Sequence, residues 1–296
     1  MRILYIFLLG IFTLGPVYSQ CTIPDSTILK IAGDIVNRDY FLYENKKGIH
    51  YAEIFTASAS LATADLMKNG NLKSALINRY KGMLVDSSKF ITERSHVDHN
   101  VQAVLPFTIY KYTGDKAYLN QGLKFANRQW ERLGPEGLTD QARWWVDDMY
   151  MIGILQLTAY RITGEKIYIE RASNMIAAYL PKLQQANGLF LHGPSAPFHW
   201  CRGNGWVASI LAEILADLPV SDPNYNAILT GYKRMMEALL KYQSDNGMWR
   251  QLIDYKYSWT ESSGTAMFAF AMTRGVNLGI LMVKIMKMLL ILLLKQ

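Results

Sequence analysis

The sequence has little cysteine, which limits the kinds of site and cross-link it can form. Only two cysteines, Cys21 and Cys201, occur among 296 residues. Two cysteines cannot make a disulfide framework or a cysteine-based metal cluster. We therefore expect one packed core cysteine and one free thiol near the N-terminus.

A strong excess of charge of one sign is also lacking. The formal net charge is +7, but four of the basic residues lie near the two ends: Arg2, Lys284, Lys287 and Lys295. The remaining excess is too small to indicate nucleic-acid binding, so no nucleic-acid partner is expected. It is compatible with an anionic substrate. Half of the residues are hydrophobic, which is enough for the core of one large domain.

The N-terminal segment differs from the rest of the chain. Residues 1–19 combine Arg2, a short apolar run and small residues before Gln20, as a secretory signal peptide does. We expect the protein to be periplasmic or secreted. Lipid attachment at Cys21 is the less favoured alternative, because Gln20 is larger than such a signal requires.

The C-terminal segment, residues 278–296, is almost entirely apolar and carries lysines without turn residues after Gly279. Lys284 and Lys287 would be costly inside a bilayer, and the run after them is too short to span one. No stable membrane span is therefore expected. We interpret residues 20–277 as one domain and 278–296 as an aberrant tail.

Between these ends, the alternation that predicts β-strands is almost absent. Apolar residues recur with helical spacing from Ser26 to about Gly275, and Gly, Pro, Asn and Asp mark the joints. The expected helices are 26–40, 52–67, 72–86, 97–112, 116–132, 145–162, 166–183, 203–217, 224–243 and 261–274.

An internal repeat shows how these helices combine. Residues 112–119 (YTGDKAYL) match residues 162–169 (ITGEKIYI), fifty positions later. In each copy glycine ends one helix, and an acidic residue suits the start of the next. A repeat of two antiparallel helices predicts hairpins stacked side by side, either in an open solenoid or in a closed ring of inner and outer helices.

Three short stretches concentrate polar and aromatic side chains: Ser95–Asn100, Arg143–Met149 and His199–Trp206. Each lies at the start of the first helix of a hairpin. In a ring of hairpins these starts share one mouth, so the three stretches converge there. This convergence indicates a functional site.

The residue types suit a sugar acid. Trp144, Trp145, Trp200 and Trp206 offer flat apolar faces, and Arg202 offers a fork for a carboxylate. Asp98, Asp147 and Asp148 can exchange protons. Taken singly, each has a plainer interpretation: aspartates in a first turn usually cap the helix, and single histidines such as His99 or His192 are usually packed. The sequence has no metal-ligand spacing, phosphate loop or serine elbow, and no metal or cofactor is expected.

At these residues the chain resembles glycoside hydrolase family 105 and its relative, family 88, the unsaturated rhamnogalacturonyl and glucuronyl hydrolases. The resemblance covers about residues 50–275. Four stretches carry it: Val97–His99, Trp144–Met151, Asn187–Trp206, and Asp245–Gln251 with Glu261–Phe268. The WWVDDMYM and RGNGW blocks are specific in this order.

This resemblance implies an all-α (α/α)6 barrel and an enzyme that hydrates the C4=C5 double bond of a terminal unsaturated uronic acid. The substrate would be a pectin- or rhamnogalacturonan-derived oligosaccharide. Asp147 would be the catalytic acid and base, Asp98 a second essential carboxylate, and Asp148 a lesser candidate. The binding residues would be Trp145, His99, His192, Trp200, Arg202 and Trp206.

The chain departs from the family pattern after Gly275, where a further helix pair is expected, so the barrel is predicted to be incomplete there. Two alternatives stay open. One is another (α/α)6 enzyme, such as an inverting glycosidase or an epimerase. The other is an inactive carbohydrate-binding relative. The sequence leaves the oligomeric state open.

Overall fold

The computed structural model describes residues 24–42, 48–84, 90–91, 96–134 and 136–282, and within them the chain is mostly helical. The signal-peptide prediction, Cys21 and residues 283–296 lie outside this part. In chain order the helices are α2 (Asp25–Asn37), α3 (Tyr51–Leu66), α4 (Gly70–Tyr80), α5 (Val97–Asn100), α6 (Val104–Thr113), α7 (Lys116–Arg128), α8 (Val146–Thr163), α9 (Lys166–Leu183), α10 (Cys201–Ile214), α11 (Tyr225–Tyr242) and α12 (Ser262–Asn277).

The internal repeat forms two equivalent helix joints. Gly114 and Gly164 adopt left-handed conformations, with φ of 71° and 74°, after α6 and α8. Their N–H groups donate to the carbonyls of Tyr110 and Tyr160 at 2.8 and 2.7 Å. These bonds close the last turn of each helix, as a C-terminal glycine does. The chain then reverses into α7 and α9, so the predicted hairpins are confirmed.

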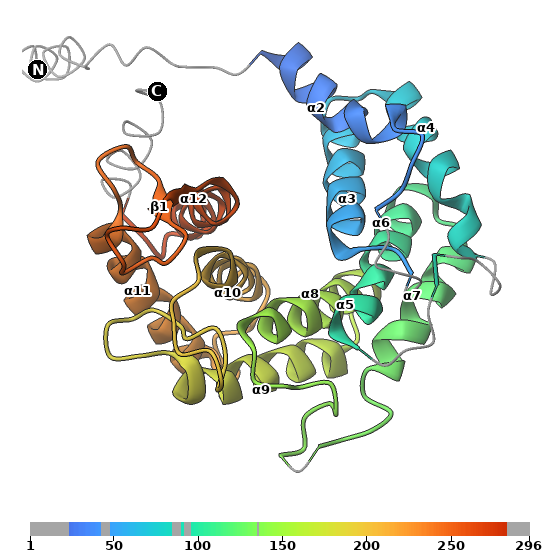
Figure 1. Cartoon of the computed structure of the whole chain (residues 1–296). Coiled ribbons are helices and arrows are strands. Elements are labelled where there is room, and N and C mark those ends of the chain that lie inside the picture. Colours follow the sequence, from blue (N-terminus) through green and yellow to red (C-terminus); the bar gives the residue numbers. More distant parts are fainter. Residues whose placement is uncertain (1–23, 43–47, 85–89, 92–95, 135, 283–296) are drawn as a thin grey trace, which may run out of the picture.

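The hairpins curve into a ring with inner and outer helices (Figure 1). The inner helices α3, α6, α8, α10 and α12 contact one another in this order, and α4, α7, α9 and α11 pack behind them. The repeat allowed an open solenoid or a closed ring, and the hairpins follow the ring arrangement with its inner and outer helices. Within the described residues, the ribbon does not close between α3 and α12.

One expected helix, 97–112, is broken. It consists of α5, the 3-10 turn η2 (Val101–Ala103) and α6. Pro106 explains the break, because proline lacks the N–H that would bond to the carbonyl four residues earlier, and its ring crowds that carbonyl. Asp98 and His99 therefore lie on a separate turn in front of α6.

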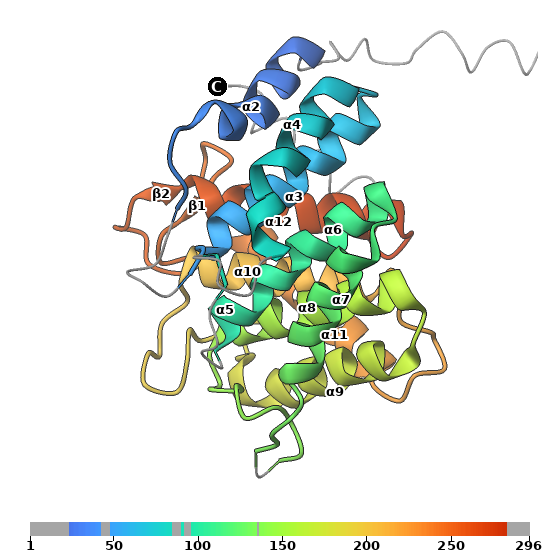
Figure 2. The ribbon, with the colours of Figure 1, turned by 90° about the vertical axis from the view of Figure 1, so that its right-hand side faces the viewer.

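A small hairpin was also not expected. Strands β1 (Trp249–Arg250) and β2 (Thr260–Glu261) pair antiparallel, with Trp249 opposite Glu261. A second short 3-10 turn, η1 (Lys81–Leu84), continues α4. Strands of two residues are too short to show alternation in a sequence. The β-hairpin loop and the loop leading to α10 project on the same side of the ring as α5 (Figure 2).

Helix α12 ends in a regular turn. The Gly279 N–H donates to the Val276 carbonyl, the Ile280 N–H donates to the Gly275 carbonyl, and Gly279 has a φ of 70°. Ile280 and Leu281 pack against the hydrophobic core. Residues 278–282, which are the described beginning of the segment 278–296, thus close the end of α12.

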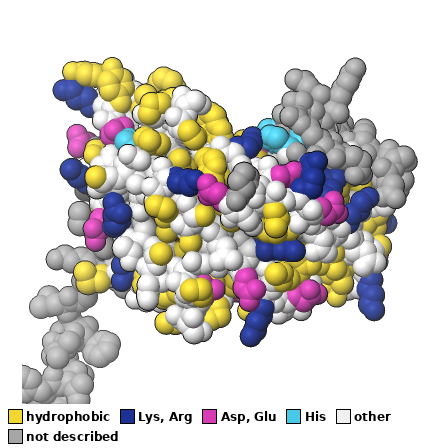
Figure 3. Space-filling view, turned by 90° about the horizontal axis from the view of Figure 1, so that it is seen from below, with side chains coloured by type: hydrophobic (Ala, Val, Ile, Leu, Met, Phe, Trp, Pro, Cys, Tyr) yellow, Lys and Arg dark blue, Asp and Glu magenta, His cyan; other side chains and the backbone are white. Residues whose placement is uncertain are grey.

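The outer surface is mixed in character. Basic, acidic and apolar side chains are interspersed over the face seen in Figure 3. Within the described residues, none of the helices combines the length and the apolar character needed to cross a bilayer. The large apolar side chains gather instead between the inner and outer helices, where Phe107, Phe125, Tyr179 and Tyr232 are fully buried.

Candidate active site

The starts of the inner helices meet at one mouth of the ring, as predicted. A cavity of about 390 Å³ opens there. Its lining comes from segments far apart in the sequence: Tyr51, Asp98, Arg143, Trp145, Asp147, His192 and Trp200. Five of these had been predicted from the sequence: Asp98, Asp147, Trp145, His192 and Trp200.

The start of α8 is held by Asp148, which is fully buried. Its Oδ2 accepts the N–H groups of Arg143 and Trp145 at 2.7 and 3.1 Å, and the Tyr179 hydroxyl at 2.9 Å. Its Oδ1 accepts the Arg143 guanidinium, with Nη2 at 2.6 Å. A carboxylate this fully bonded fixes the helix start and has no lone pair directed at the mouth. Asp148 is therefore a scaffold residue next to Asp147.

Trp144 makes this arrangement possible through an uncommon backbone conformation. Its φ is 64°, in the left-handed region that non-glycine residues rarely adopt. Its neighbours Arg143 and Trp145 thereby donate to the same Asp148 oxygen, while the Trp144 N–H donates to the Tyr179 hydroxyl at 3.1 Å. Such conformations cost about 1–3 kcal/mol and persist where the surroundings enforce them, often at functional sites.

Asp147 has an environment suited to a proton donor. Burial, followed by the negative charges of Asp98 and Asp148, raises the pKa of its carboxyl to about 6. Asp98 lines the same cavity, and its Oδ2 lies 3.5 Å from His96 Nδ1. Arg143 Nη1 in turn donates to His96 Nε2 at 2.8 Å. The site therefore contains one carboxyl that keeps its proton up to about pH 6, well above the usual range of an aspartate, beside a second, less buried one.

Aromatic rings enclose the carboxyls. His192 stacks on Trp200 with centroids 4.8 Å apart and meets Trp145 edge-on at 4.7 Å. Its Nε2 lies 3.8 Å from Asp147 Oδ2. Burial and the nearby Arg202 charge lower the pKa of His192, which keeps the ring neutral at neutral pH. Gly193 leaves space for this packing, since a Cβ there would lie 2.9 Å from the Trp145 ring.

Arg202 flanks the cavity without lining it. Its guanidinium carbon lies 4.2 Å from the centroid of the Trp200 ring. Within the described part of the chain, its buried Nε has no hydrogen-bond partner, and the same holds for His192 Nδ1. Buried polar atoms of this kind are rare and usually bind water or a ligand. Both atoms belong to residues around Trp200.

Three predicted site residues lie elsewhere. His99 is 1% exposed and belongs to the core behind Asp98. Trp206 is also buried and packs against Tyr51, Phe55 and Tyr150 inside the ring. Asp148 is the scaffold residue described above. None of the three lines the cavity at the mouth.

Two lining residues had not been assigned. Tyr51 is the first residue of α3 and meets Trp206 edge-on at 5.9 Å, so it separates the mouth from the ring interior. Like Asp98 and Trp145, it lies at a helix start, and this shared position is the sequence signal that could have identified it as a lining residue. Arg143 lies within a stretch that had been noted, but its links to Asp148 and His96 depend on the fold.

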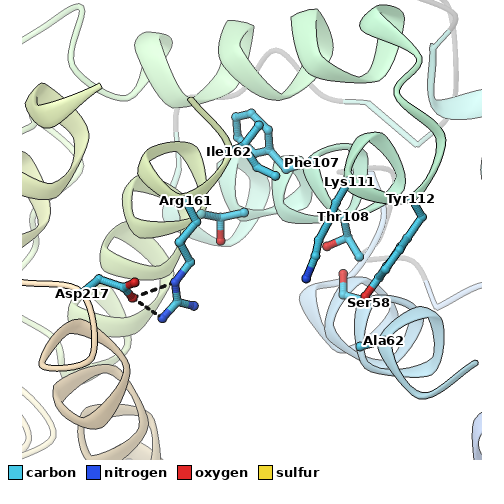
Figure 4. A pocket seen from close by; sticks show the side chains of 10 residues that line it. Ser58, Ala62, Phe107, Thr108, Lys111, Tyr112, Arg161, Ile162 and Asp217 are labelled. Carbon is cyan, nitrogen blue, oxygen red and sulfur yellow. Dashed lines mark hydrogen bonds and ion pairs between the residues drawn. The ribbon is translucent and has the colours of Figure 1, made fainter. Parts of the chain in front are cut away.

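Two further cavities follow the axis of the ring. One of about 600 Å³ lies between the inner helices and is lined by Phe55, Tyr150, Trp206 and Met267, among others. The other, of about 480 Å³, opens at the opposite end (Figure 4). There Arg161 binds Asp217 through Nε at 2.8 Å and Nη2 at 2.6 Å. Arg161 is thus held in an ion pair at that end, whereas Asp147 lines the cavity at the mouth.

The described residues contain no cluster of three or more His, Cys, Asp or Glu side chains that could hold a metal ion. Cys201 is fully buried against Glu261, as a packed core cysteine would be.

The fold and the site together define the class: a toroid of helical hairpins with an acidic, aromatic-walled pocket at one mouth. Solved structures share this fold. A possible GH105 family member from Salmonella enterica superposes with a TM-score of 0.78 at 16% identity, covering 95% of this chain and 85% of that one. A family 105 glycoside hydrolase from C. acetobutylicum gives 0.74 at 20% identity, covering 88% and 79%. The predicted (α/α)6 fold is thus confirmed.

The sequence profile of glycosyl hydrolase family 88 matches residues 27–289, and the chain belongs to this family. An unsaturated 3S-rhamnoglycuronyl hydrolase from Alteromonas is 30% identical over 154 residues, which are 48% of this chain and 37% of the relative. The unsaturated rhamnogalacturonyl hydrolase YesR of Bacillus subtilis is 25% identical over 185 residues, which are 55% and 54%. The matched regions thus span about half or less of these curated relatives.

Proposed function

We propose that the protein removes a terminal 4,5-unsaturated uronic acid from pectin- or rhamnogalacturonan-derived oligosaccharides. The observation that carries the proposal is the environment of Asp147. Its carboxyl has a pKa of about 6 and lies in a pocket walled by Trp145, His192 and Trp200. Family membership and the names of the matched relatives support it. We further infer from residues 1–19 that the protein is exported.

In the proposed reaction, the Asp147 carboxyl donates its proton to C4 of the C4=C5 double bond. Water adds its oxygen to C5 and returns a proton to the Asp147 carboxylate, so that the residue serves as acid and then as base. The hemiketal formed at C5 opens, and the sugar separates from its aglycone. The added atoms are those of one water molecule, and no redox change at the enzyme is needed.

The surrounding residues have distinct proposed roles. Asp98 helps to keep Asp147 protonated, because its charge raises the pKa of Asp147. Trp145 and Trp200 enclose the flat unsaturated ring between aromatic faces. Arg202 flanks the cavity beside Trp200, and its proposed role is to bind the uronate carboxylate through a pair of hydrogen bonds from its guanidinium.

The test is turnover of lyase-digested rhamnogalacturonan by Asp147→Asn. Asparagine keeps the shape but cannot transfer a proton, so we expect a loss of about 10²- to 10⁴-fold or more in kcat. Loss of the near-ultraviolet absorbance of the double bond reports the reaction. Asp140→Asn, an exposed aspartate in the loop before α8, is the matched control and should keep full activity. Near-normal turnover by Asp147→Asn would refute the assignment.

A further inference from the structure

Three large aromatic side chains stand exposed on the loop between β1 and β2. Tyr255, Tyr257 and Trp259 are 52%, 74% and 70% exposed. We refer to these three residues as the aromatic platform. Single exposed apolar side chains are common, but a cluster of rings on one short loop usually marks a binding surface.

The platform loop is well ordered by its own hydrogen bonds. The Gln251 N–H donates to the Trp259 carbonyl at 2.8 Å, and the Ser258 N–H donates to the Tyr255 carbonyl at 3.1 Å. Tyr255 and Tyr257 meet edge-to-face at 5.6 Å, and Lys256 Nζ lies 4.9 Å from the Tyr257 ring centroid. The loop backbone and the pair of tyrosine rings are thus ordered before a ligand binds, which lowers the entropy cost of binding.

The same loop is bonded on both sides of Trp200. The Cys201 N–H donates to the Gln251 carbonyl at 2.9 Å, and the Ile253 N–H donates to the His199 carbonyl at 3.0 Å. His199 Nδ1 also lies 2.8 Å from Asp254 Oδ2. Since Trp200 lines the candidate active site, the loop that carries the platform starts directly beside the wall of that pocket. Figure 2 shows both loops on this side of the ring.

From this adjacency we infer that the aromatic platform binds the part of the oligosaccharide that extends beyond the terminal uronic acid. Pyranose rings have apolar C–H faces that pack on flat aromatic rings, while their hydroxyls stay in water. A pocket of about 390 Å³ takes the terminal sugar, and the following sugars must leave through the mouth. The inference rests on the proposed function. It predicts that the platform makes the enzyme selective for longer oligosaccharides.

The experiment compares an unsaturated disaccharide with an unsaturated tetrasaccharide as substrates of the full chain. We expect Tyr257→Ala and Trp259→Ala to raise KM for the tetrasaccharide about 3- to 10-fold each, the scale of one aromatic contact. KM for the disaccharide and kcat for both substrates should stay unchanged. Tyr257→Phe, which keeps the ring, should have the same KM for the tetrasaccharide as the wild type. Val220→Ala, an exposed apolar residue between α10 and α11, is the surface control.

Binding of the tetrasaccharide by calorimetry, in an Asp147→Asn background, separates this inference from the proposed function. If the wild type hydrolyses neither substrate but the platform variants weaken binding, the proposed reaction is wrong and the binding role of the platform is supported. If turnover occurs and neither variant changes the tetrasaccharide KM or its binding, the platform is refuted. Equal losses for disaccharide and tetrasaccharide would also refute it. So would a wild-type dimer that Tyr257→Ala dissociates without a change in KM.

Discussion

At the scale of single residues, the site depends on two neighbouring aspartates with opposite environments. Asp148 is saturated with hydrogen bonds from Arg143, Trp145 and Tyr179, whereas Asp147 lies next to aromatic rings and other carboxylates. Adjacent positions on a helix point about 100° apart. One aspartate therefore supports the helix start, while the other faces the cavity.

The raised pKa of Asp147 predicts a stability cost that depends on pH. The folded state holds the proton up to about pH 6, while the unfolded chain releases it near pH 4. Stability is therefore lost as the pH rises from about 4 to about 6, and it stays lower above that. Asp147→Asn should raise the free energy of unfolding by about 1–3 kcal/mol at pH 8. Urea unfolding at pH 8 and pH 4 measures this.

The gain in the free energy of unfolding of Asp147→Asn should vanish at pH 4. The control Asp140→Asn should show no such difference between the two pH values. A variant that is less stable than the wild type at pH 8 would contradict the buried, proton-holding state of Asp147.

Much of the site was predictable at this scale, because chemistry-bearing residues gather at helix starts. What the sequence could not show is which of these side chains face the cavity at the mouth and which are buried in the core. His99 and Trp206 are of the right type and in the right stretches, yet both are buried, since the break at Pro106 and the packing around Tyr51 decide their direction. Tyr51 itself resembles any core tyrosine until the ring brings it against Trp206 of α10.

At the scale of elements, the start of α8 depends on an outer helix. Tyr179 of α9 bonds both Asp148 and the strained Trp144 backbone. Tyr179→Phe removes both contacts and should lower the free energy of unfolding by about 1–3 kcal/mol, because it leaves the Trp144 N–H unpaired. Tyr225→Phe is the control and should change it by less than about 0.5 kcal/mol. Equal stability of the two variants, by urea unfolding, would contradict this anchoring role.

Close contact between α10 and α12 requires a residue without a side chain at position 264. A Cβ on Gly264 would lie 2.8 Å from the backbone carbonyl of Cys201. Gly264→Ala should force the two helices apart and cost about 1–3 kcal/mol. Gly70→Ala, where a Cβ meets nothing within 4 Å, should be neutral or slightly stabilising. Thermal unfolding of both variants decides, and an unchanged midpoint for Gly264→Ala would refute the close packing.

Helix positions were predictable because apolar spacing and glycine joints are local signals. The predicted 145–162 and 166–183 correspond to α8 and α9 within one residue. The β-hairpin was not predictable, because its two-residue strands pair through the fold rather than through a pattern. Its loop nevertheless carries the aromatic platform.

At the scale of the whole molecule, the ring brings distant helix starts to one mouth and leaves a cavity along its axis. The repeat predicted stacked hairpins, but curvature into a ring follows from how each pair packs on the next. The family profile reaches residue 289, beyond the boundary at 277 that the sequence had indicated. Ile280 and Leu281 show the same continuity, because they pack on the core.

The central claim is that Asp147 protonates a double bond rather than assisting direct displacement of the aglycone. The most direct test follows two signals in one reaction with an unsaturated disaccharide: near-ultraviolet absorbance and release of the second sugar. Hydration predicts that the absorbance falls no later than the sugar is released, with one double bond lost for each sugar released. Sugar release that precedes the loss of absorbance would contradict the account.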